Sequence, residues 1–182
     1  MKSPTLLTVV ACAASMLGLQ ELAAGANASD TVLDTEFCDT YYSLGAAKEP
    51  GFPDCDVVKA SVKSELNTDS SDLLPTLSLG MENTSKPAIF FIHGYPDNAA
   101  EWAAQFATFC HGPSAKYRCL APTWGDMHPD VPNSPANELN FAAQLDKLAA
   151  TARHAGLTNE TDVTLWIHDW GSVLGYSEFS ES

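Results

Sequence analysis

The sequence predicts an α/β fold built on a doubly wound, mostly parallel sheet. Short apolar runs, typical of buried strands, alternate over residues 76–176 with longer stretches that have helical spacing. Two of these runs, at 87–92 and 163–167, pass straight into a tight polar turn and then into small residues that can begin a helix. Strand, turn and helix in this order form the repeating unit of a parallel sheet with helices on both faces.

Two segments precede these repeats. A basic start, the apolar run Leu6–Leu19 and the Ala26-Asn27-Ala28 site are typical of a signal peptide that ends at residue 28. The run is shorter than the roughly 20 residues that span a bilayer, so a membrane anchor is the less favoured interpretation. Residues 29–75 are expected to form a loop-rich extension, or in their first half a poorly ordered leader, because Pro, Gly and polar residues interrupt them. The partial α/β domain is then 76–182.

Each element of this domain follows from a local pattern. The expected order is strand 76–80, strand 87–92, helix 98–109, strand 117–121, loop 123–135, helix 137–155 and strand 163–167. Trp102, Phe106 and Phe109 recur at helical spacing and are expected in the core. The inward face of the second helix should comprise Leu139, Ala142, Ala143, Leu145, Leu148 and Ala149, and Gly156 should end that helix.

The cysteines fit an oxidising compartment. Removal of the leader leaves Cys38, Cys55, Cys110 and Cys119, and this even number suggests two disulfides in a secreted protein. Nearest-neighbour pairing is the simplest of three connectivities, and buried free thiols are the alternative. The absence of a C-x-x-C pair disfavours a thiolate metal site, so no metal is expected. Two N-glycosylation sequons begin at Asn83 and Asn159 in expected loops.

The stretch 163–176 has the pattern of a nucleophile elbow, a sharp strand-turn-helix that lifts one side chain above a sheet edge. Ser172 does not fit the nucleophile position, because Trp170 rather than glycine stands two residues before it. Asp169 does fit, since Gly171 and Ser172 follow at the positions that must be small. The alternative is a turn aspartate that caps the next helix. We therefore expect a carboxylate nucleophile.

His168-Asp169-Trp170-Gly171-Ser172 resembles the elbow of α/β-hydrolase-fold epoxide hydrolases and haloalkane dehalogenases, which use an aspartate nucleophile. His93-Gly94-Tyr95-Pro96 resembles the H-G-x-P turn of the same enzymes. The resemblance covers about residues 75–176. It implies that the Tyr95 and Trp170 amides form an oxyanion hole and that His93 and His168 have packing roles. The implied substrate is a small apolar epoxide or haloalkane, attacked without a cofactor.

One position separates the two families. Dehalogenases commonly carry Asn after the His-Gly pair, whereas this chain has Tyr95 followed by Pro96, the form found in epoxide hydrolases. Ser172 looks more like a dehalogenase residue, and the Trp170 indole could bind a halide or simply pack in the core. The position after His-Gly concerns a ligand contact, so it favours an epoxide hydrolase. The 123–135 loop lacks the usual D-x-R-G-x-G pattern of these families.

The resemblance also implies missing parts. In this fold the acid and the base histidine follow the nucleophile, and no histidine follows Asp169. His111, His128 and His154 are expected on the surface. With no cap domain either, the chain is expected to be the N-terminal half of an α/β hydrolase, inactive in turnover; a catalytically dead secreted binding protein is the alternative. The tail after Tyr176 departs from the apolar helix expected there.

The charge balance excludes one class of partner. Nine Lys and Arg residues stand against 23 Asp and Glu residues, a formal net charge of −14. Such a chain repels nucleic acids and anionic membrane surfaces, so neither is expected as a partner.

Overall fold

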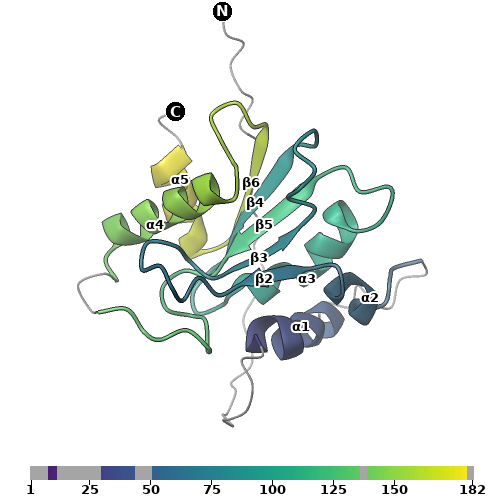
Figure 1. Ribbon diagram of the computed structural model, residues 1–182, viewed down its shortest axis with the longest axis horizontal. Helices are drawn as coiled ribbons and strands as arrows, with labels where there is room; N and C mark the ends of the chain where they lie inside the picture. Colours follow the sequence, from purple (N-terminus) through teal and green to yellow (C-terminus); the bar gives the residue numbers. More distant parts are fainter. Residues whose placement is uncertain (1–7, 12–29, 44–50, 136–138, 180–182) are drawn as a thin grey trace, which may run out of the picture.

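The computed structural model describes residues 8–11, 30–43, 51–135 and 139–179. Their strands form one sheet of six, in the order β1-β6-β4-β5-β3-β2, with helices packed on both faces (Figure 1). The central strands β4 (Ala88–Ile92), β5 (Arg118–Pro122) and β6 (Val163–Ile167) are parallel, whereas β2 (Lys63–Glu65) and β3 (Thr76–Leu79) run antiparallel at one edge. The predicted α/β, mostly parallel architecture is confirmed.

The sheet separates two apolar layers. On one face, Phe91 of β4 packs with Trp102 and Phe106 from the helical stretch η3 (Ala99–Trp102), α3 (Ala103–Gln105) and η4 (Phe106–Cys110). On the other face, α4 (Phe141–His154) and α5 (Trp170–Phe179) cover side chains that include Phe90 and Ile92. Every residue of β4 and β5 is buried, as expected of strands covered on both faces.

The extension before β3 is more helical than we expected. Thr31–Ser43 forms one continuous helical segment, η1 (Val32–Glu36) followed by α1 (Phe37–Ser43), and α2 (Cys55–Lys59) follows it. Val32, Phe37 and Tyr41 are fully buried, and the Phe37 ring packs edge-on against Phe106. The reason is an apolar stripe at helical spacing that lies between acidic residues. The extension is therefore part of the core on that face.

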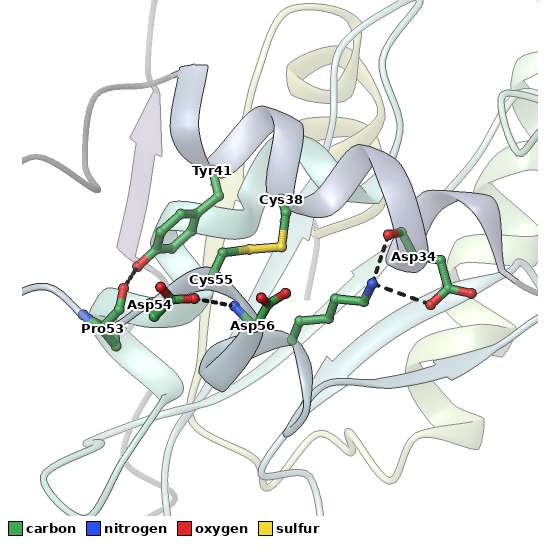
Figure 2. Close-up of a disulfide and its surroundings, with 8 residues drawn as sticks. Asp34, Cys38, Tyr41, Pro53, Asp54, Cys55 and Asp56 are labelled. Carbon is green, nitrogen blue, oxygen red and sulfur yellow. Dashed lines mark hydrogen bonds and ion pairs between the residues drawn. A yellow bond between two sulfur atoms is a disulfide. The ribbon is translucent and has the colours of Figure 1, made fainter.

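Disulfides fix both helical regions in the predicted nearest-neighbour pairing. Cys38–Cys55 joins α1 to α2, and Cys110–Cys119 joins the end of η4 to β5. Figure 2 shows the first bridge beside two further contacts: the Tyr41 hydroxyl donates to the Pro53 carbonyl, and Asp54 caps α2 by accepting from the Asp56 amide at 3.0 Å. Lys59, at the end of α2, forms an ion pair with the Asp34 carboxylate and donates a hydrogen bond to the Asp34 carbonyl.

The structure corrects the second predicted helix. Asn140 caps it and it begins at Phe141, so Leu139 lies before its first turn and is 46% exposed. Ala142 is also exposed, whereas Leu148 and Ala149 are buried as predicted, together with Gln144, which accepts from the Gly125 amide. Gly156 follows the helix in a left-handed conformation, as expected.

Both ends of the chain also differ from expectation. α5 continues to Phe179, so the helix extends beyond Tyr176 despite its polar tail. Residues Thr8–Ala11, inside the predicted signal peptide, form strand β1, which pairs in parallel with β6. The predicted cleavage point at residue 28 lies outside the described residues. None of the helices in the described segments has the length and apolar character needed to cross a bilayer.

Candidate active site

Asp169 stands on the turn between β6 and α5, where the chain reverses sharply. Its φ of 46° lies in the left-handed region, which aspartate tolerates better than most residues. Gly171 allows this turn, because a Cβ there would lie 2.4 Å from the carbonyl oxygens of both Ile92 and His93. Strand, left-handed aspartate and tightly packed glycine are the features of a nucleophile elbow.

The turn after β4 comes from a neighbouring strand and meets Asp169. The Tyr95 amide donates to Asp169 Oδ2 at 3.2 Å, so the two predicted residues converge at the carboxyl edge of the sheet. Hydrogen bonds from the Trp170 and Tyr95 amides lower the pKa of Asp169 below its ordinary value. Gly94 lies directly beneath: a Cβ there would be 2.9 Å from the Asp169 Cβ. The carboxylate is ionised and exposed at neutral pH.

His93 supports this turn from below. It is fully buried; its Nδ1 lies 2.6 Å from the Gly94 carbonyl and its Nε2 accepts from the Trp124 amide at 3.1 Å. The Trp124 indole stacks on the ring and donates to the His93 carbonyl at 2.9 Å. Burial lowers the pKa of His93 to about 4, so the imidazole is neutral and both nitrogens are engaged. It contacts neither Asp169 oxygen and acts as a structural residue.

A second group beside Asp169 was not predicted from the sequence. Glu101 Oε1 lies 2.5 Å from Nδ1 of His168, the residue before the elbow, and Glu101 Oε2 accepts from the Gly94 amide at 3.2 Å. Asp97 lies nearby, and its pKa is raised by burial and, to a lesser extent, by Asp169, against the lowering effect of His168. The available signal was the position of Glu101 on the first helical turn after the H-G-x-P segment.

Two groups of carboxylates and imidazoles could in principle hold a metal ion. Asp97, Glu101 and His168 have ligand atoms within 4.8 Å of one another, and so do Asp30, His128 and Asp130. In each group, however, the imidazole already contacts a carboxylate: His168 with Glu101, and His128 with Asp30 at 3.2 Å. These contacts account for both groups as internal ion-pair or hydrogen-bond clusters.

His128 was expected on the surface, and this expectation is wrong, because the residue is only 5% exposed. Its partner Asp30 comes from the start of the N-terminal helical segment, a contact that local sequence cannot indicate. His154 is exposed as expected, and His111 is half-buried.

Apolar side chains surround the elbow on the solvent side. Large side chains that are about half exposed here include Tyr95, Phe141, Trp170, Val173 and Tyr176. Trp170 is 49% exposed, so it is not a core residue, and its ring lies 5.7 Å from that of Phe141. An ionised carboxylate therefore lies next to an apolar rim, an arrangement suited to attack on an apolar electrophile.

A solved structure shares this fold. An epoxide hydrolase from an endophytic Streptomyces superposes with a TM-score of 0.51 at 18% identity, over 66% of this chain and 34% of that one. The chain has an α/β-hydrolase fold. An epoxide hydrolase from Vigna radiata gives a TM-score of 0.46 at 19% identity, over 65% of this chain and 36% of that one.

In sequence, no family model matches the chain. A cis-3-alkyl-4-alkyloxetan-2-one decarboxylase from Xanthomonas campestris pv. campestris is 28% identical over 94 residues, which cover 48% of this chain and 29% of that protein. The α/β-hydrolase-fold chain thus spans about a third of the length of the proteins that it resembles.

Proposed function

We propose that this chain carries the nucleophile half of an epoxide hydrolase-like active site, in which Asp169 attacks a carbon electrophile. The observation that carries this proposal is the exposed Asp169 carboxylate on a left-handed elbow, with the Tyr95 amide on its Oδ2. A turn aspartate that only capped α5 would have no need of an amide from a separate strand. The lowered pKa keeps the nucleophile ionised at neutral pH.

The bond changes are those of an alkyl-ester mechanism. One Asp169 oxygen forms a C–O bond to the substrate carbon, the epoxide C–O bond breaks, and the alkoxide takes a proton from water. The Tyr95 and Trp170 amides hold the carboxylate so that its attacking oxygen faces the substrate, and they stabilise the oxyanion when the ester is later attacked. The apolar rim, including Trp170 and Phe141, favours a small apolar substrate.

An epoxide is favoured over a haloalkane because Tyr95 occupies the place of the Asn that commonly contacts halide in dehalogenases. The Trp170 indole is exposed at the rim, which keeps a haloalkane as the second candidate. The similarity to an oxetanone decarboxylase adds a third electrophile to test, a strained four-membered lactone.

Release of the ester is the step for which the described residues offer no base. Water needs a positioned base to hydrolyse an alkyl ester. His93 has both nitrogens engaged and His128 faces Asp30, while His168, whose Nδ1 contacts Glu101, stands before the nucleophile and not after it, where the enzymes that this chain resembles carry their base. We therefore expect this chain to stop at the ester, with no turnover.

Intact-protein mass spectrometry tests the proposal. Incubation with a styrene-type epoxide should add one substrate mass per chain, located on Asp169 by peptide mapping, and Asp169→Asn should abolish the adduct. Asn is the matched control because it has nearly the same shape and also tolerates a left-handed backbone. An unmodified wild-type protein would contradict the proposal and favour a binding protein without catalysis. Multiple turnovers that depend on Asp169 would contradict the expected stop at the ester.

We also propose that this protein is secreted. The two disulfides fit an oxidising compartment, and the sequon residues Asn83 and Asn159 are both exposed in turns. Glycans at these positions would leave the Asp169 edge uncovered, since both precede strands whose opposite ends carry the site. Mass analysis of the secreted protein before and after glycosidase treatment measures both glycosylation and cleavage near residue 28.

A further inference from the structure

Glu101 connects the two turns that form the candidate site. It lies in η3, and its side chain is mostly buried. One oxygen accepts from the Gly94 amide, in the turn after β4; the other lies 2.5 Å from His168 Nδ1, in the turn after β6. These turns supply the Tyr95 amide and the Asp169 carboxylate, so a single side chain joins the backbone of the Gly94–Tyr95 turn to the side chain of His168, the residue before the nucleophile.

The local helix does not need this side chain for its own stability. Asn98 already caps η3, because its side chain accepts from the Ala100 amide at 2.9 Å. A buried carboxylate is costly unless its oxygens have partners, and both oxygens of Glu101 contact groups of the site, not its own helix: Oε2 accepts from the Gly94 amide and Oε1 lies close to His168 Nδ1. This points to a role at the site.

We propose that Glu101 is a positioning residue, which holds the Gly94–Tyr95 turn and His168 together so that the Tyr95 amide stays on Asp169. The inference rests on the proposed function of Asp169. The distance that Glu101 controls is the 3.2 Å contact between the Tyr95 nitrogen and Asp169 Oδ2. Loss of Glu101 would remove the link between two turns that come from different strands.

The surroundings give this role a dependence on pH. Burial, with a smaller contribution from Asp97, raises the pKa of Glu101 to about 7 against the lowering effects of His168 and the Gly94 amide. Above pH 7 the carboxylate is ionised, accepts strongly from the Gly94 amide and attracts the His168 imidazole; below pH 7 it is protonated and both contacts weaken. Asp169, with a lowered pKa, stays ionised throughout this range.

The test uses a bromoalkane, because the departing bromide takes the bonding electron pair and needs no proton. The single-turnover rate of Asp169 alkylation is measured by mass spectrometry from pH 5.5 to 8.5 in wild type, Glu101→Gln, Glu101→Ala and the exposed control Glu160→Ala. We expect the wild-type rate to rise through about pH 7. Glu101→Ala should react about tenfold to a hundredfold more slowly, the loss expected for a buried hydrogen-bonding group. Glu101→Gln keeps an acceptor for Gly94, so its rate should be intermediate and independent of pH over this range.

Amide hydrogen exchange gives a readout that does not depend on alkylation. In Glu101→Ala, exchange at Gly94 and Tyr95 should become faster while β5 stays protected; Glu160→Ala should match wild type. Wild-type rates and exchange in Glu101→Ala, or a persistent pH step in Glu101→Gln, would overturn the inference. If wild type is not alkylated at all, the proposed function fails, and the exchange data alone decide the role of Glu101.

Discussion

Gly94 has no side chain at the point where the two site turns meet, and Gly94→Ala therefore tests the geometry of the site. The added Cβ would lie 2.9 Å from the Asp169 Cβ and 3.0 Å from His168 Nδ1, whereas ordinary contacts begin at 3.4 Å. Asp169 must then move by at least about 0.5 Å relative to the Tyr95 amide. Because a misplacement of about 1 Å can cost on the order of a hundredfold in rate, we expect alkylation of Asp169 to slow by roughly tenfold or more.

The assay is the same adduct measurement, performed together with thermal unfolding. The control is Gly112→Ala, since a Cβ at Gly112 has open space and tests only the cost of a left-handed backbone far from the site. Gly94→Ala should lose rate with a small change in Tm, whereas Gly112→Ala should keep its rate and lose only stability. Undiminished alkylation in Gly94→Ala would refute the idea that the contact between these turns sets the reactive geometry.

Two further predictions concern stability. The pKa of His93 is lowered from 6.5 to about 4, so between these values the unfolded chain binds a proton on His93 and the folded chain does not. The contribution of neutral His93 to the free energy of unfolding is therefore complete above pH 6.5 and is lost as the pH falls towards 4. The measurement uses the Glu101→Gln variant, because titration of Glu101 would change the stability in the opposite direction. In urea unfolding, the free energy of unfolding of this variant should fall by about 3 kcal/mol between pH 6.5 and 4. A free energy that does not change with pH would exclude a neutral buried imidazole. Replacing both Cys38 and Cys55 by Ser should lower the free energy of unfolding by about 3 kcal/mol, the value expected from the loop-closure entropy for a separation of 17 residues. Denatured, unreduced secreted protein should show no reactive thiol among its four paired cysteines, and labelling of all four would disprove the bridges.

The strands and the elbow were predictable because their signals are local. Ala88–Ile92 is an uninterrupted apolar run, as a strand buried on both faces requires, and Val163–Ile167 is rich in residues that favour strands. The tight turn at Asp169 was predicted from the small residues after it, and the 2.4 Å approach at Gly171 shows why they must be small. In these cases steric constraints act over a few residues, so the sequence carries them directly.

The parts that were missed depend on partners far away in the chain. Glu101 gains its significance only when Gly94 and His168 are placed against it, and the buried His128 contacts Asp30, almost a hundred residues away. The N-terminal helix is a different case, since Phe37 and Tyr41 are spaced by four residues and the apolar stripe was available. Acidic residues and later prolines obscured it.

The left-handed backbone at Asp169 also bears on how such a site could be lost in evolution. Most side chains would strain this turn, but asparagine and glycine would not, so these replacements remove the carboxylate at little cost to folding. A single nucleotide change converts an aspartate codon to one for either residue. A descendant that kept the disulfides, the sheet and the apolar rim could therefore turn from reacting with an electrophile to merely holding it, without passing through an unstable ancestor.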